Sequence, residues 1–156
     1  MQPEIVIFCL GNPARGDDAI GAVLFERLER IPGNFDLYFE FQLGIEHALE
    51  LEGRDCAFFV DASVNVGGPF EMKEIFPKIE FAHSTHILAP EALLGIYRDV
   101  MKRNPPKSYL LGVKGQSFRL GEPLSIEAAS NLEHAWCFLK DFIGLKCGFG
   151  KAAIPG

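Results

Sequence analysis

Short apolar runs alternate along this chain with segments in which apolar residues recur every three or four positions. The runs cover residues 4–9, 35–41, 56–60 and 109–113. Helical spacing is found over residues 17–30, 44–52, 90–101 and 125–142. Unbroken apolar runs are typical of strands buried on both faces, which requires a parallel sheet covered by helices on either side. The pattern therefore predicts a three-layer α/β/α sandwich with a mostly parallel sheet.

One segment differs from the other strand-like runs. Residues 70–76 alternate apolar and charged side chains, which is typical of a strand with one exposed face. We expect this segment to form an antiparallel strand at the edge of the sheet. A length of 156 residues fits one domain, which we place at residues 1–145. We expect residues 146–156 to form a flexible tail.

The composition excludes several classes of function. A net charge of −6 disfavours a nucleic-acid partner, because phosphate binding needs a basic face. The apolar run at residues 5–10 is too short to cross a membrane and has no basic segment before it, so neither an anchor nor a signal peptide is indicated. The four cysteines form no Cys-x-x-Cys pair, and Cys9 and Cys56 lie in apolar runs as expected of buried thiols. We expect a monomeric cytoplasmic protein without membrane or nucleic-acid partners.

Polar residues that could carry chemistry follow the predicted strands. Asn12, Asp17 and Asp18 come after the first strand, Asp61 ends the third, and His86 lies in a later loop. Ligands of such sheets bind beyond the carboxyl ends of the strands. Two carboxylates and one imidazole suit a borderline divalent ion such as nickel, zinc or iron. The loop after the first strand has neither phosphate-binding glycine motif, and adjacent carboxylates would repel a phosphate.

Simpler roles are open to each of these residues. Asp17 and Asp18 could complement a helix dipole, and Asp61 could cap a turn. His86 could be a surface residue, and the nearby His83 is an alternative ligand. The sequence has no Gly-x-Ser-x-Gly segment, which disfavours a serine hydrolase of the elbow type.

The same three loops resemble the signatures of a known family. Residues 10–21, Leu-Gly-Asn-Pro-Ala-Arg-Gly-Asp-Asp-Ala-Ile-Gly, are similar to the N-terminal signature of hydrogenase maturation endopeptidases. Residues 60–62, Val-Asp-Ala, and residues 84–86, Ser-Thr-His, resemble the second and third motifs of that family. Order and spacing agree over residues 4–143, nearly the whole chain.

The resemblance implies an endopeptidase that removes a C-terminal peptide from the large-subunit precursor of a nickel-iron hydrogenase. By position it assigns metal binding and catalysis to Asp18, Asp61 and His86. The trio would bind nickel that the precursor already holds, and no organic cofactor is implied. Hydrolysis by metal-activated water and a role of the metal in recognition alone both fit these ligand types.

The chain departs from the family pattern in two places. Ala19 replaces a glycine that many members have. Residues 41–47, Phe-Gln-Leu-Gly-Ile-Glu-His, replace an Asp-Gly-Gly-Thr type of segment and resemble the branch that serves NAD-reducing hydrogenases. We therefore assign substrate contact to Gln42, with Asn12 and Asp17, although Gln42 could instead cap a strand end. The alternatives to a peptidase are a metal-binding or chaperone-like module and a small-ligand α/β domain.

Overall fold

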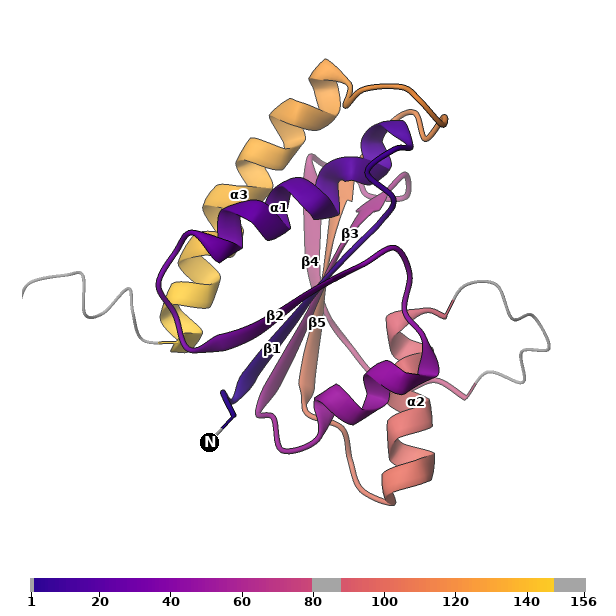
Figure 1. Ribbon diagram of the computed structural model, residues 1–156, viewed down its shortest axis with the longest axis vertical. Helices are drawn as coiled ribbons and strands as arrows, with labels where there is room; N and C mark the ends of the chain where they lie inside the picture. Colours follow the sequence, from indigo (N-terminus) through magenta and orange to yellow (C-terminus); the bar gives the residue numbers. More distant parts are fainter. Residues whose placement is uncertain (1, 80–87, 148–156) are drawn as a thin grey trace, which may run out of the picture.

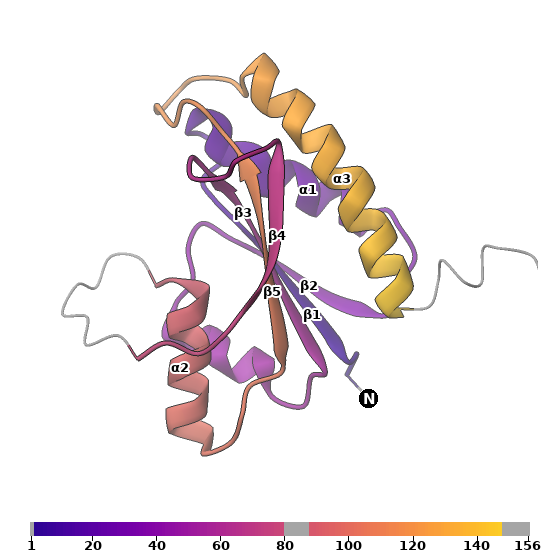
Figure 2. The ribbon, with the colours of Figure 1, turned by 180° about the vertical axis from the view of Figure 1, so that it is seen from behind.

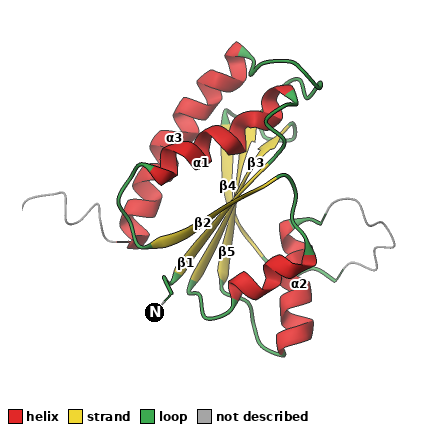
Figure 3. Ribbon diagram, in the orientation of Figure 1, coloured by secondary structure: helices red, strands yellow, loops and turns green. Residues whose placement is uncertain are grey.

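The computed structural model describes residues 2–79 and 88–147, and these form a five-stranded sheet with helices on both faces (Figures 1 and 3). The strands are β1 (Ile5–Leu10), β2 (Phe35–Glu40), β3 (Cys56–Ser63), β4 (Phe70–Ile75) and β5 (Lys107–Lys114). Their order across the sheet is β2-β1-β3-β5-β4. Only the β4–β5 pair is antiparallel among the strands described. The predicted sandwich with one antiparallel edge strand is confirmed.

The helices cover both faces of the sheet. They are the 3₁₀ helices η1 (Gly16–Ala19) and η2 (Ile45–Leu51) and the α-helices α1 (Ile20–Glu29), α2 (Pro90–Met101) and α3 (Ile126–Cys147). Helices α1 and α3 lie on one face, and α2 with η2 lies on the other (Figures 1 and 2). In β1, Ile7 and Cys9 join the core under α1 and α3, whereas Val6 and Phe8 join the core under α2. Both faces of β1 are buried, which explains its unbroken apolar sequence.

Helix α3 differs from expectation in its buried face and in its length. Ser125 caps the helix, because its Oγ accepts a hydrogen bond from Ala128 N at 3.1 Å. Ile126 begins the apolar spacing of residues 125–142, which indicates a buried position, but it is 86% exposed. The helix extends to Cys147, so residues 146 and 147 of the predicted tail belong to it, and residues 148–156 lie outside the described residues. Cys56, expected to be buried, is half-buried.

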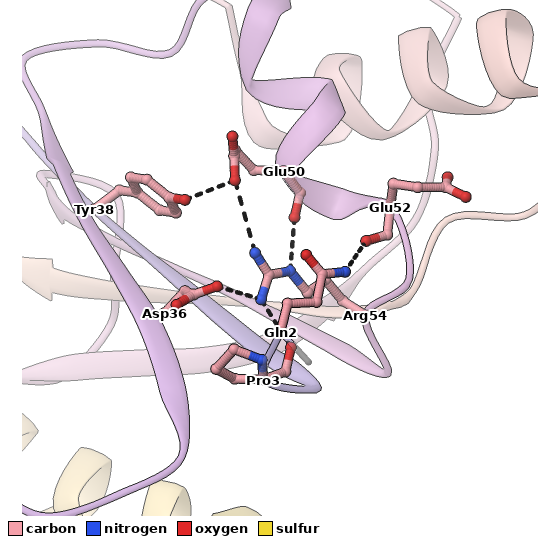
Figure 4. A network of polar contacts seen from close by, with 7 residues as sticks. All are labelled: Gln2, Pro3, Asp36, Tyr38, Glu50, Glu52 and Arg54. Atoms are coloured by element: carbon pink, nitrogen blue, oxygen red, sulfur yellow. Dashed lines mark hydrogen bonds and ion pairs between the residues drawn. The ribbon is translucent and has the colours of Figure 1, made fainter.

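A buried arginine ties the elements together at the amino end of the sheet (Figure 4). Arg54 Nη1 lies 2.6 Å from Asp36 Oδ2 of β2 and donates to Pro3 O, just before β1, at 2.7 Å. Its Nε donates to Glu50 O of η2 at 2.9 Å, and Tyr38 OH donates to Glu50 Oε2 at 2.6 Å. The network lies at the edge of the sheet opposite the carboxyl ends of β1 and β3. No helix in the described residues is long and apolar enough to span a bilayer.

Candidate functional site

A cleft of about 530 Å³ opens at the carboxyl ends of β1 and β3. Its walls come from the loops after β1 and β2, the end of β3, and the residues that lead into α2. The lining residues are Leu10, Gly11, Asn12, Arg15, Asp18, Phe41, Gln42, Leu43, Asp61, Leu88, Ala89 and Pro90. Two predicted metal ligands, Asp18 and Asp61, therefore lie in the same cleft.

Two glycines allow the loop after β1 to bring Asp18 to this position. Gly11 has φ +132°, and a Cβ there would lie 2.3 Å from the carbonyl oxygen of Asp18. A Cβ on Gly21 of α1 would lie 2.1 Å from Leu10 O at the end of β1. Either side chain would collide with backbone, so both glycines are needed for the loop to fold back and for α1 to begin against β1.

The Asp18 carboxylate is held by the loop itself. Asp18 Oδ2 accepts a hydrogen bond from Asn12 N at 2.7 Å. The Asn12 side chain forms its own turn, because its Oδ1 accepts from Ala14 N at 2.9 Å. Residue Ala19 occupies the N-cap of α1, with no side-chain cap hydrogen bond. Asp18 thus binds a loop amide and keeps an exposed edge toward the cleft.

Asp61 has the most perturbed acidity among the described carboxylates. Burial, together with the negative charge of Asp18, raises its pKa from 3.8 to about 7. A hydrogen bond from Ala62 N to Asp61 Oδ1, at 2.8 Å, offsets part of this effect. A divalent cation bound beside Asp61 and Asp18 would relieve the repulsion that Asp61 experiences.

Asp17 lies in the interior rather than in the cleft. It is fully buried, and its Oδ2 accepts hydrogen bonds from Gln116 N at 2.7 Å and Ser117 N at 3.2 Å. Ser125 donates its N–H to Oδ1 at 2.7 Å and its hydroxyl to Oδ2 at 2.9 Å. Burial opposes ionisation, but the four hydrogen bonds outweigh it and lower the pKa of Asp17. The predicted substrate contact by Asp17 does not fit this placement, because the carboxylate instead fastens η1 to the loop between β5 and α3.

Gln42 is exposed in the cleft wall, and His47 holds the loop that carries it. The buried His47 accepts a hydrogen bond at Nδ1 from Gly44 N, at 2.8 Å. Its Nε2 lies 3.3 Å from Glu40 Oε1 at the end of β2. The imidazole therefore links both ends of the loop, and its edge packs against Phe8. Gln42 therefore lies on a loop whose two ends are held by the His47 side chain.

Sequence reasoning overlooked two side chains of the cleft. Arg15 lies within the first motif and contributes a cation to the wall of the cleft that holds the two carboxylates. Phe41 is 60% exposed, although it directly follows a strand. An arginine three residues before Asp18 and an aromatic residue just past β2 were the available signals.

The third member of the predicted trio, His86, lies outside the described residues, as does the alternative ligand His83. Within residues 2–79 and 88–147, no group of three or more His, Cys, Asp or Glu residues could hold a metal ion. Burial raises the pKa of the Cys9 and Cys56 thiols, so neither suits a nucleophile. The chemistry that the described cleft can offer is that of its two carboxylates.

Several solved structures with the same architecture are described as hydrogenase maturation proteases. Hydrogenase maturating endopeptidase HybD from E. coli matches with a TM-score of 0.67 and 21% identity, over 89% of this chain and 90% of that one. The [NiFe] hydrogenase maturation protease HycI from Thermococcus kodakarensis matches with a TM-score of 0.68 and 23% identity, over 91% and 93% of the two chains.

The fold is that of these hydrogenase maturation proteases. A hydrogenase 2 maturation peptidase from a Thaumarchaeota archaeon also matches, with a TM-score of 0.63 and 18% identity over 91% of this chain and 99% of that one. No protein-family model matches the sequence, and no curated protein matches it. The likeness therefore rests on three-dimensional structure.

Proposed function

We propose that this protein is an endopeptidase that removes the C-terminal peptide of a nickel-loaded hydrogenase large-subunit precursor. The observation that carries the proposal is the pair Asp18 and Asp61, facing one cleft at the carboxyl edge of a sheet whose fold is shared with maturation proteases. His86 is proposed as the third ligand on the strength of the third motif. The nickel belongs to the substrate and serves as the recognition element.

The acidity of Asp61 supports a role for the metal of the substrate. With its pKa near 7, about half of Asp61 is protonated at neutral pH when no cation is present. A divalent ion carried into the cleft favours the ionised form of both carboxylates. Thiolate ligands from the precursor would select softer ions such as nickel over magnesium or calcium. Precursor that lacks nickel then loses the contact that bridges it to Asp18 and Asp61.

The cleft wall formed by Phe41 and Gln42 suits contact with the precursor. Gln42 lies in the segment that replaces the Asp-Gly-Gly-Thr type of segment of the family, and the exposed Phe41 beside it presents an apolar surface. We propose that this segment contacts the precursor and that the partner is of the NAD-reducing type. A neutral amide reads hydrogen bonds rather than charge, so Gln42→Glu should impair cleavage more than Gln42→Asn does.

The test uses purified precursor, loaded with nickel or nickel-free, and a mass measurement of the large subunit. The loaded form should lose its C-terminal peptide, and the nickel-free form should stay intact even with added magnesium or calcium. Asp18→Asn and His86→Ala should abolish cleavage, whereas the matched His83→Ala should not. Equal cleavage of the loaded and nickel-free precursor would refute nickel recognition by these residues.

A metal-binding or chaperone-like module is the second candidate, because the cleft offers two carboxylates and the thiols of Cys9 and Cys56 do not suit a nucleophile. A gel-shift experiment with the loaded precursor separates the two functions. A stable complex whose large subunit keeps its full mass would identify a chaperone. Conversion of the precursor to the shorter mass by catalytic amounts of the protein would identify the peptidase.

A further inference from the structure

A second cavity, of about 270 Å³, lies on the other side of Asp61. Asp61 and Pro90 line both this cavity and the larger cleft. The remaining walls come from the end of β3 with its following loop, from β5 and from the edge strand β4. Asp61 therefore stands between two hollows along the carboxyl edge of the sheet.

The floor of the second cavity is a glycine that lies between two acidic residues of the neighbouring strands. Gly112 of β5 lies in register with Asp61 of β3 on one side and with Glu71 of β4 on the other. Residues in register project toward the same face of a sheet. Phe59, two residues before Asp61, belongs to the core under α2, so the row faces the α2 side. Between the two carboxylates, Gly112 itself contributes no side chain.

The backbone does not require glycine at this position. Gly112 is not among the described glycines with positive φ, and a Cβ there would lie 3.3 Å from Val66 Cγ1 and 3.5 Å from Ser63 Cβ. A small side chain could thus be accommodated by a slight shift of Val66. Glycine inside a strand loses packing and often marks a place where another backbone or a ligand approaches closely.

The far wall of the cavity carries both signs of charge. Glu71 and Lys73 are exposed on β4, the outermost strand, and both line the cavity. Two strand spacings separate Asp61 from this wall, which is about 10 Å. An extended peptide advances about 3.3 Å per residue, so about three residues span the distance. The missing side chain at Gly112 and the polar wall suit an extended polypeptide better than a compact apolar ligand.

We propose that this second cavity binds the segment of the substrate beyond the scissile bond, as about three extended residues that lie over Gly112 between Asp61 and Lys73. The inference rests on the proposed peptidase function. If the precursor presents its metal to Asp18 and Asp61 in the larger cleft, the second cavity is the adjoining hollow, because Asp61 and Pro90 line both. The Lys73 ammonium on its far wall would attract carboxylates of the departing segment.

The test compares two nickel-loaded precursors: one with its full C-terminal extension and one cut back to a single residue beyond the scissile bond. Gly112→Val should raise KM for the full extension at least about tenfold, because it adds three carbon atoms and a single methylene in a pocket commonly changes specificity by this factor. Lys73→Ala, on an exposed edge far from Asp61, should also raise KM and leave kcat unchanged. The matched control Lys140→Ala, exposed on α3, should behave as wild type.

The shortened precursor decides whether the effect belongs to the departing segment. Wild type, Gly112→Val and Lys73→Ala should cleave it with the same KM. The subsite would be overturned if either variant had the wild-type KM for both precursors. It would also be overturned if the KM of a variant rose equally for both precursors. If Gly112→Val fails to fold, Lys73→Ala decides alone. Failure of wild type to cleave the full-length loaded precursor would instead overturn the proposed function.

Discussion

Replacing Asp17 by asparagine tests whether this buried carboxylate holds the loop that presents Asp18. The substitution keeps the size of the side chain but leaves one oxygen where there were two. Asp17 Oδ2 accepts three hydrogen bonds and Oδ1 accepts one from Ser125 N. The best orientation keeps the oxygen at the Oδ2 position and turns the amide NH₂ toward Ser125 N–H. Two donors then face each other, and the other three hydrogen bonds lose their charge assistance.

The expected cost follows from these contacts. Loss of one hydrogen bond to a charged acceptor costs about 1.5–3 kcal/mol, and an unpaired buried donor adds to this. We expect Asp17→Asn to lower the free energy of unfolding at pH 7 by about 3 kcal/mol. For a chain of this length the melting temperature should fall by about 6–12 °C.

The stability lost in Asp17→Asn should depend on pH. The pKa of Asp17 is lowered in the folded protein, so its ionised form stabilises the fold above the unfolded pKa of about 4. This contribution is lost as pH falls through the folded pKa. The stability gap between wild type and Asp17→Asn should therefore be full at pH 7 and should shrink in acid.

Urea unfolding followed by circular dichroism, in metal-free buffer, measures both effects. Asp141→Asn is the control, because this carboxylate is exposed on α3 and its loss should change stability by less than about 0.5 kcal/mol. The reasoning is refuted if Asp17→Asn unfolds at the same urea concentration as Asp141→Asn. A gap that stays constant between pH 7 and pH 3 would also contradict it.

Two further substitutions test the cleft and the opposite end of the sheet. Because burial and Asp18 raise the pKa of Asp61 to about 7, its ionisation opposes folding of the metal-free protein, and stability is lost as pH rises from about 4 through 7. In the presence of chelator at pH 8, Asp61→Asn should therefore have a free energy of unfolding higher than that of wild type, by at most about 4 kcal/mol. The two free energies should converge near pH 4. A wild type that is more stable than Asp61→Asn at pH 8 would contradict the raised pKa of Asp61. Arg54→Met removes a buried guanidinium from Asp36, Glu50 and Pro3 and should cost about 2–3 kcal/mol, since both carboxylates are partly exposed. Below its melting temperature, Arg54→Met should have the kcat/KM of wild type for the precursor. A lower kcat/KM without a loss of stability would contradict this and would show that the Arg54 contacts influence the cleft.

The local pattern of the sequence was enough to predict the architecture and the edge of the sheet that carries the site. Runs such as residues 56–60 are apolar at every position, and only a sheet covered on both faces buries all of them. Once the strands are parallel, their carboxyl ends meet at one edge, so Asp18 and Asp61 are brought together although they are far apart in the sequence. Motif resemblance added the expected roles, which the structure of the described residues leaves as proposals.

The tertiary structure alone decided what neighbouring residues do. Asp17 and Asp18 are adjacent and chemically identical, yet one is buried and the other faces the cleft, because the partners of Asp17 lie 99 to 108 residues later in the chain. The same anchoring of Ser125 sets where α3 begins, which leaves Ile126 exposed against its pattern. Gly112 becomes a cavity floor only because β3 and β4 place carboxylates on either side of it. Periodicity records which side of its own element a residue occupies, whereas these roles depend on contacts between distant segments, which no local pattern contains.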